Sequence, residues 1–156
     1  MQFETIYNDY WQRIFRLCMG YTNDHAMAQD LTQETFIAVW QHLPKFRKEA
    51  DIGTWIYRIA SNNCLRNIEK ERRLPKGEIP ANIREEEQHS IEPDIQLLYQ
   101  FISDLPETDR IIISLELEDV KQAEIASIVG LSEANIRVKI HRIKEKLTQK
   151  FRAHEQ

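Results

Sequence analysis

The sequence predicts an all-α protein in which two small helical domains are joined by a flexible acidic linker. Only 4 Gly and 5 Pro occur in 156 residues, which leaves few of the tight turns that an all-β fold requires. Apolar residues recur at spacings of three and four along most of the chain, which is the period of an α-helix. Residues 76–91 break this pattern, because they contain Pro80, the acidic run 85–87 and few large apolar side chains. We therefore expect one domain at residues 1–75 and a second at residues 92–156.

Three helices are expected in the first domain. Apolar side chains at helical spacing predict the first at residues 3–19. The second covers residues 25–42, and the Thr-Asn-Asp sequence at 22–24 precedes it with side chains that cap helix N-termini. The third covers residues 54–73 and ends before Pro75, which cannot continue a helix. The first domain is therefore predicted to be a helical bundle.

The second domain is predicted to begin with two helices. The first opens near Pro93, because the first turn of a helix tolerates proline. The second covers residues 106–117. Asp104 is its expected N-cap and Glu107 follows three residues later, which is the order of a capping box.

Two further helices, at residues 122–129 and 133–152, have the dimensions of a DNA-binding helix-turn-helix. Gly130 can adopt the positive φ of a helix C-cap at low steric cost. Ala126 is small enough to let the two helices approach, and the Ser132 hydroxyl can cap the second helix. The three-residue turn between the helices is therefore well specified.

The long terminal helix is predicted to bury one side and to present a basic side. Its apolar residues fall within a narrow arc at 100° per residue and are expected to face the core: Ile136, Ile140, Ile143 and Leu147. The opposite side is expected to carry Ala134, Arg137, Val138, His141 and Arg142, with Lys139 and Lys144 on the flanks. Arginine can pair with a guanine edge through two hydrogen bonds, and lysine can bind phosphates. DNA contact is the favoured interpretation, and an ordinary solvated helix face is the alternative.

The charge is distributed unevenly along the chain. A formal net charge of −4 would by itself argue against nucleic-acid binding. However, residues 76–104 carry 2 basic against 7 acidic side chains, whereas residues 132–153 carry 7 basic against 2 acidic. The acidic excess therefore lies in the middle of the chain, and a basic terminal helix follows it.

Neither a cofactor nor a metal site is expected. Cys18 and Cys64 lie in separate stretches and are too few for a disulfide framework or a four-ligand zinc site. No apolar run approaches the ~20 residues that cross a bilayer, and the N-terminal sequence lacks the order of a signal peptide. We therefore expect a cytoplasmic protein without membrane insertion.

The third helix combines aromatic, amide and basic side chains, as sites for single-stranded nucleic acid do. Bases stack on aromatic rings at such sites, while cations follow the phosphates. Trp55, Tyr57, Arg58, Asn62 and Arg66 supply these groups here. Burial of the aromatic side chains in the core is an equally good interpretation of the residue types alone.

Three segments, in this order, carry a resemblance to a known family. They are residues 30–36 (DLTQETF), residues 54–62 (TWIYRIASN), and the helix-turn-helix after the acidic linker. Together they resemble the extracytoplasmic-function class of bacterial RNA polymerase sigma factors. The resemblance covers roughly residues 3–75 and 92–150, and the order and separation of the segments are more specific than any one alone.

The resemblance implies that the partners are the RNA polymerase core and promoter DNA, together with an anti-sigma factor. The residues that match the family's polymerase-docking surface are Asp30, Gln33, Glu34 and Ile37. We expect Phe36, Ile37 and Trp40 to point away from the buried side of the second helix, because an exposed apolar excess suits a partner surface.

The resemblance also assigns two DNA sites. Phe46 and Asn62 match positions that flank an unstacked base of the promoter's upstream melting element, with the loop 47–53 around it. The candidates for the melting element are Phe46, Arg47, Trp55, Arg58, Asn62 and Arg66. The candidates for the distal promoter element are Ser132, Asn135, Arg137, Val138, Lys139, His141 and Arg142.

Three classes of function compete. A sigma factor would deliver polymerase to a promoter and melt it, without chemistry of its own. A freestanding helix-turn-helix regulator would bind duplex DNA without polymerase. An enzyme is disfavoured, because the chain has no phosphate-cradling Gly loop, no carboxylate and His set at metal-ligand spacing and no nucleophile motif.

Overall fold

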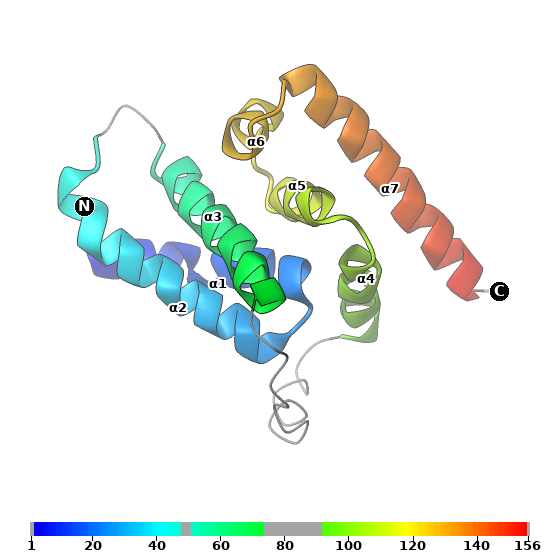
Figure 1. Ribbon diagram of the computed structural model, residues 1–156, viewed down its shortest axis with the longest axis horizontal. Coiled ribbons are helices and arrows are strands. Elements are labelled where there is room, and N and C mark those ends of the chain that lie inside the picture. The colour runs from blue at the N-terminus through cyan, green and yellow to red at the C-terminus, as the bar shows by residue number, and fades with distance from the viewer. Residues whose placement is uncertain (1, 48–50, 74–91, 156) are drawn as a thin grey trace.

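The structure is a computed structural model that describes residues 2–47, 51–73 and 92–155 (Figure 1). Within these ranges every regular element is helical, so the predicted all-α class is confirmed. The predicted acidic linker, residues 76–91, lies outside the described residues. The elements are α1 (Phe3–Thr22), α2 (His25–His42), the 3₁₀ turn η1 (Leu43–Lys45), α3 (Ile52–Arg73), α4 (Pro93–Ser103), α5 (Glu107–Leu117), α6 (Gln122–Val129) and α7 (Glu133–Glu155).

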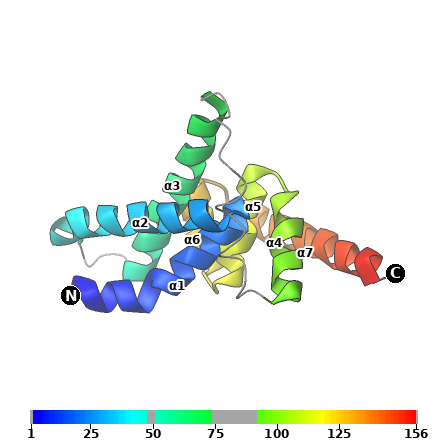
Figure 2. The same ribbon diagram turned by 90° about the horizontal axis from the view of Figure 1, so that it is seen from below.

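Helices α1 and α2 lie side by side, and α3 crosses them (Figure 2). The tight reversal between α1 and α2 is fixed by capping. Asn23 adopts a left-handed conformation with φ 50°, which asparagine tolerates better than most residues. The Asp24 carboxylate accepts a hydrogen bond from the Met27 N–H at 3.1 Å. The capping expected at residues 22–24 is thus confirmed.

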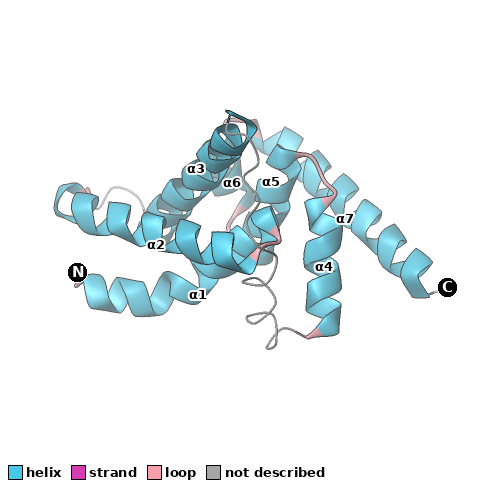
Figure 3. Ribbon diagram, turned by 60° about the horizontal axis from the view of Figure 1, so that its bottom comes forward, coloured by secondary structure: helices cyan, strands magenta, loops and turns pink. Residues whose placement is uncertain are grey.

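The helix-turn-helix is formed by α6 and α7 as the sequence predicts. Gly130 has φ 77°, and its N–H donates to the Ala126 carbonyl at 2.9 Å. The Ser132 hydroxyl accepts a hydrogen bond from the Asn135 N–H at 3.1 Å and so caps α7. The helices α4 to α7 form the second group, in which α5 contacts α4, α6 and α7 (Figure 3).

The N-cap predicted for α5 is wrong. Pro106 occupies the N-cap position with extended backbone angles, and no side chain caps the helix there. Asp104 instead ends α4, and its carboxylate accepts a hydrogen bond from Lys150 Nζ at 3.1 Å. Because α5 starts at Glu107, Asp104 lies too far ahead of it to cap it. A lysine of α7 binds the Asp104 carboxylate instead.

The two groups of helices pack against each other along α1 and α5. They approach each other closely at Gly20, where a Cβ would lie 2.2 Å from Ser114 Oγ, so no larger residue fits without a shift. Leu17 and Tyr21 of α1 are fully buried, as are Ile112 and Ile113 of α5. Burial of apolar surface is the main stabilising term in folding, and here one continuous core serves both groups. Among the described helices, none is long and apolar enough to span a membrane.

Candidate nucleic-acid and polymerase interfaces

The outer side of α7 is an exposed basic surface. The apolar arc Ile136, Ile140, Ile143 and Leu147 is buried, as expected. The opposite side is exposed at Ala134, Asn135, Arg137, Val138, His141 and Arg142. This helix follows the turn of the helix-turn-helix, which is the position of a recognition helix in the DNA major groove. The geometry therefore allows both arginines to reach base edges.

The lysines on the flanks of α7 are tied to acidic neighbours. Lys139 Nζ lies 3.4 Å from Asp109 Oδ1 of α5. Lys144 Nζ lies 3.2 Å from Glu116 Oε2 of the same helix. An exposed or half-exposed ion pair of this kind contributes about 0–1 kcal/mol, so DNA phosphates can displace the carboxylates. The flanks of α7 are thus partly neutralised by carboxylates of α5.

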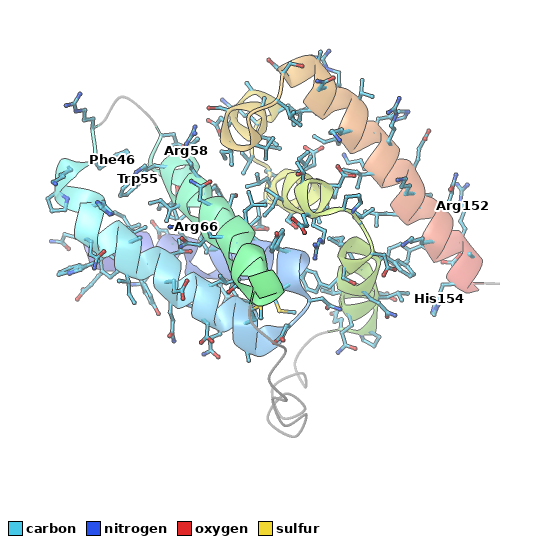
Figure 4. The ribbon with its side chains drawn as sticks, viewed as in Figure 1. Phe46, Trp55, Arg58, Arg66, Arg152 and His154 are labelled. Carbon is cyan, nitrogen blue, oxygen red and sulfur yellow. The ribbon has the colours of Figure 1, made fainter. Side chains whose placement is uncertain are left out.

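Phe46 and Trp55 form an aromatic pair at the start of α3 (Figure 4). Their ring centroids are 4.8 Å apart and the rings are tilted by 35°. The turn η1 places Phe46, because the Phe46 N–H donates to the Leu43 carbonyl at 3.0 Å. Phe46 and Trp55 are both half-buried, so each ring keeps part of its surface open for stacking.

The polar candidates on α3 follow one side of the helix. At 100° per residue, Trp55, Arg58, Asn62 and Arg66 fall within an arc of about 80°. Asn62 is exposed, as are Arg66 and the more distant Arg47. The structure therefore brings the aromatic pair and the basic residues onto one surface, as the sequence predicts for a single-stranded site.

A buried amide holds Arg66 in place, and the sequence analysis missed it. Arg66 Nη2 donates to Asn63 Oδ1, and Asn63 Nδ2 donates to Thr35 Oγ1 at 3.3 Å. Asn63 is only 8% exposed. The threonine hydroxyl in turn donates to the Leu31 carbonyl at 2.7 Å, so α2 anchors the chain of hydrogen bonds. The signal available in the sequence was two adjacent asparagines that point about 100° apart around α3, of which only Asn62 was assigned to a site.

Arg58 differs from its neighbours because it contacts the second group of helices. Its Nη2 donates to Ser127 Oγ at 2.7 Å, and its Nη1 donates to the Ser127 carbonyl at 3.4 Å. Ser127 belongs to α6, the first helix of the helix-turn-helix. The proposed α3 surface therefore touches the first helix of the helix-turn-helix in this structure.

The candidate polymerase stripe on α2 is exposed. Asp30, Gln33 and Glu34 are solvent-accessible, and Ile37 is 57% exposed. Trp40, one turn further on, is 63% exposed. Large apolar side chains at such exposure are typical of partner surfaces.

The expectation for Phe36 is wrong, because its side chain is only 2% exposed. Tyr7 covers it from α1, with ring centroids 5.0 Å apart. Phe3 packs edge-on against both Phe36 and Trp40, at 6.5 and 5.1 Å. An aromatic cluster of Phe3, Tyr7, Phe36 and Trp40 thus extends the α2 stripe onto α1.

Two buried groups inside the bundle, Tyr57 and Cys64, have raised pKa values. Burial, with a further contribution from the Glu118 carboxylate, raises the pKa of Tyr57 to about 12. Cys64 Sγ lies 3.8 Å from Cys18 Sγ, so the fold brings together two thiols that the sequence separates. The hydrogen bond to Cys18, followed by burial, raises the pKa of Cys64. Both cysteines are free and buried, which makes them poor nucleophiles.

Two family descriptions match the chain in succession. Sigma-70 region 2 matches residues 6–74, and Sigma-70 region 4 matches residues 95–147. The two matches together place the chain in the class of Sigma-70 factors. The RNA polymerase sigma-H factor of Pseudomonas aeruginosa is 29% identical over 92% of this chain and 82% of its own length. The ECF RNA polymerase sigma factor SigM of Bacillus subtilis is 25% identical over 94% of this chain and 93% of its own length. The chain belongs to the extracytoplasmic-function class of RNA polymerase sigma factors.

Solved structures share the fold. The sigma factor RpoE of Bartonella quintana, crystallised with the anti-sigma factor NepR, has a TM-score of 0.77 and 18% identity, with 94% of each chain covered. CnrH, solved in complex with the cytosolic domain of CnrY, has a TM-score of 0.71 and 20% identity, with 97% of this chain and 88% of that chain covered. In both cases the likeness is one of fold.

Proposed function

We propose that this sigma factor divides promoter recognition between two DNA surfaces and binds polymerase through a third. Residues 1–75 would bind polymerase and melt the promoter. Residues 92–156 would read the distal promoter element, and residues 76–91 would join the two. The observation that carries the proposal is the exposed basic side of α7, presented by a complete helix-turn-helix.

The distal element is assigned to α7 because the exposed side chains there match the chemistry of base edges. Arg137 and Arg142 are exposed and can form two hydrogen bonds each with guanine. Val138 and His141 lie between them, and the Val138 side chain can pack against a thymine methyl group. Ser132, Asn135 and Lys139 lie nearer the edges of this surface, where phosphates pass.

The melting element is assigned to the surface of α3 and the residues just before it. A base that leaves the duplex loses stacking worth a few kcal/mol, and a pocket has to replace that energy. Phe46 offers an aromatic ring, and Asn62 offers an amide that can bind a base edge. Arg47, Arg58 and Arg66 supply positive charge for the separated strand, while Trp55 supports the Phe46 ring at 4.8 Å.

Polymerase is assigned to the α2 stripe together with the aromatic cluster. Asp30, Gln33 and Glu34 provide polar and acidic groups, and Ile37 with Trp40 provides exposed apolar area. Interfaces derive most of their binding energy from a few large anchors such as tryptophan. Trp40, held edge-on by Phe3, has the exposure and the support of such an anchor.

We further propose that the protein acts in the cytoplasm, carries no catalytic activity of its own and is controlled by an anti-sigma factor. Each point follows from membership of the class. RpoE was crystallised with the anti-sigma factor NepR, and CnrH was solved in complex with the cytosolic domain of CnrY.

Run-off transcription tests the proposed function directly. Purified core polymerase would be incubated with genomic DNA fragments in the presence and absence of this protein. We expect discrete transcripts that depend on both proteins. A chain that binds duplex DNA tightly by itself, but yields no polymerase-dependent transcript, would instead be a freestanding helix-turn-helix regulator.

A further inference from the structure

The hydrogen bonds that run from α2 to Arg66 have a fixed direction. The Thr35 hydroxyl has one hydrogen, and it donates that hydrogen to the Leu31 carbonyl at 2.7 Å. Thr35 Oγ1 can therefore only accept from Asn63, whose Nδ2 lies 3.3 Å away, so the NH₂ group of the amide faces α2. The amide oxygen of Asn63 is then left for another donor, and it accepts the hydrogen bond from Arg66 Nη2.

The groups that anchor Arg66 lie in the packing of α2 on α3. Thr35 is fully buried, and Asn63 is 8% exposed. A buried amide lowers stability unless its hydrogen bonds are made, whereas an apolar side chain at this position would have no such requirement. A polar pair thus occupies a core position from which it reaches an exposed arginine.

This anchor restricts where the Arg66 guanidinium can bind. If the guanidinium moved away, the oxygen of a largely buried amide would lose this partner, which is unfavourable. The guanidinium can keep the bond and still bind a phosphate, because it has five N–H donors. Arg66 is therefore best placed to bind a strand whose backbone passes its anchored position.

The anchored position is defined relative to the other groups on α3. Asn63 and Arg66 are three residues apart, so their side chains are neighbours on the helix surface. Arg66 lies about 16 Å along the helix axis from Trp55 (Figure 4) and about one turn beyond Asn62. A strand whose base is held by Phe46 and Asn62 therefore meets Arg66 in one particular register.

We propose that Asn63 is a positioning residue that determines specificity, because it anchors Arg66 and so makes binding of the separated strand depend on register. Strands that Phe46 and Asn62 hold in the matching register gain the Arg66 contact, and other strands do not. The inference rests on the proposed function for the assignment of α3 to the separated strand. It adds Asn63, and Thr35 as its support, to the residues that control this surface.

Selection from a random pool of single-stranded DNA tests the inference with the full chain. The parent protein enriches a preferred strand from molecules of about 20 nucleotides. Selectivity is the ratio of the affinity for that strand to the affinity for the unselected pool, both measured by fluorescence anisotropy. We expect Asn63→Ala to lower this ratio about fivefold, as is typical of coupling within one hydrogen-bond network. General damage to the fold would weaken both affinities alike and leave the ratio unchanged.

Further variants show whether Asn63 acts through Arg66. Arg66→Ala should lower the ratio by a similar factor, and adding Asn63→Ala to it should change the ratio by less than about twofold. Thr35→Val removes the group that orients the amide and should act like Asn63→Ala, so it also tests the inference if Asn63→Ala does not fold. Thr35→Ser keeps a hydroxyl and should keep the parent ratio.

Asn67→Ala is the matched control on the same helix. Asn67 Nδ2 lies 3.1 Å from Met27 Sδ, so this asparagine also connects α3 to α2. However, it points about 100° away from Arg66 around the helix. Its loss should be seen in thermal unfolding, and the ratio should stay at the parent value.

The inference is overturned if Asn63→Ala keeps the parent ratio, if Asn67→Ala lowers it equally, or if the parent enriches no strand. It is also overturned if Asn63→Ala causes a further loss in the Arg66→Ala background. If selectivity changes as expected but run-off transcription never occurs, the inference stands and the proposed sigma activity fails. If transcripts form and Asn63→Ala keeps the parent ratio, only the inference fails.

Discussion

The two proposed DNA surfaces differ in how free their basic side chains are. On α7, Arg137 and Arg142 are exposed, and the lysines beside them pair with carboxylates of α5. On α3, Arg58 is bound to Ser127, and Arg66 is bound to Asn63. The arginines of the helix-turn-helix are thus exposed, whereas two arginines of the proposed α3 surface already hold contacts within the chain.

The two proposed DNA surfaces therefore have different energetic requirements. Reading a duplex requires rigid side chains at fixed spacing, which the buried arc of α7 provides. Holding a separated strand requires that binding repay the cost of unstacking. Contacts that already occupy Arg58 and Arg66 would reduce non-specific binding of single strands. Four predictions test the comparison, from the largest effect to the smallest.

The largest effect is expected for Phe46→Ala. Loss of base stacking should cost ~1–3 kcal/mol, about 5- to 150-fold in promoter opening, with duplex binding by α7 unchanged. The measurement is transcription from a normal template and from one with a pre-opened bubble at the melting element. Phe46→Tyr keeps an aromatic ring and serves as the control. Equal loss on both templates would remove the melting role from this residue.

The next effect is expected for Arg137→Ala and Arg142→Ala. Each should relax sequence preference at one base pair by about 1–3 kcal/mol, because a bidentate contact with guanine is lost. Selection of bound sequences from a random pool measures the change. Arg152→Ala, in the exposed last turn of α7 (Figure 4), is the control and should keep the parent preference. If the other two variants keep it as well, the reading side has been assigned to the wrong part of α7.

A smaller effect is expected for Glu34→Lys on α2. Charge reversal in the polymerase stripe should weaken core association by about tenfold, ~1.4 kcal/mol, with the stability of the fold changed by ~0.5 kcal/mol or less. A titration of labelled protein with core polymerase measures the affinity, and thermal unfolding checks the fold. Asp9→Lys lies on the side of α1 opposite Phe3 and Tyr7 and is the matched control. Unchanged affinity would exclude the stripe from the interface.

The smallest effect is expected for Lys139→Ala. This lysine already pairs with Asp109 at 3.4 Å, so its gain on binding a phosphate is offset by the pair that it leaves. We expect weaker binding of all sequences alike, by less than about 1 kcal/mol, and a shallower dependence of affinity on salt. Anisotropy titrations at several salt concentrations measure both quantities. A change in base preference would place Lys139 on the reading side instead.

Much of the fold followed from local signals in the sequence. Gly130 and Ser132 specify the turn of the helix-turn-helix through a positive φ and a capping hydroxyl, and both signals act within a few residues. Helical periodicity likewise located the buried arc of α7. The predicted cap at Asp104 was wrong because the helix starts at Glu107, two residues later than a cap at Asp104 requires.

The contacts that the sequence could not predict join segments that are far apart along the chain. Phe36 was expected to be exposed, but its position on α2 is covered by Tyr7 of α1. Arg58 and Ser127 are separated by 69 residues, and the packing of the second group of helices on α1 and α3 brings their helices together. Periodicity shows which side of a helix is apolar, but it does not show what covers that side. The assignment of each residue to DNA or polymerase likewise remains a prediction.

Gly20 makes one position decide how closely two helices that are far apart in the sequence can pack. A Cβ there would lie 2.2 Å from Ser114 Oγ of α5, so even alanine requires a shift between α1 and α5. Neither Gly20 nor Ser114 belongs to the proposed DNA surfaces or to the α2 stripe. A single codon can therefore alter the packing of the two groups of helices while every residue proposed to contact DNA or polymerase stays the same.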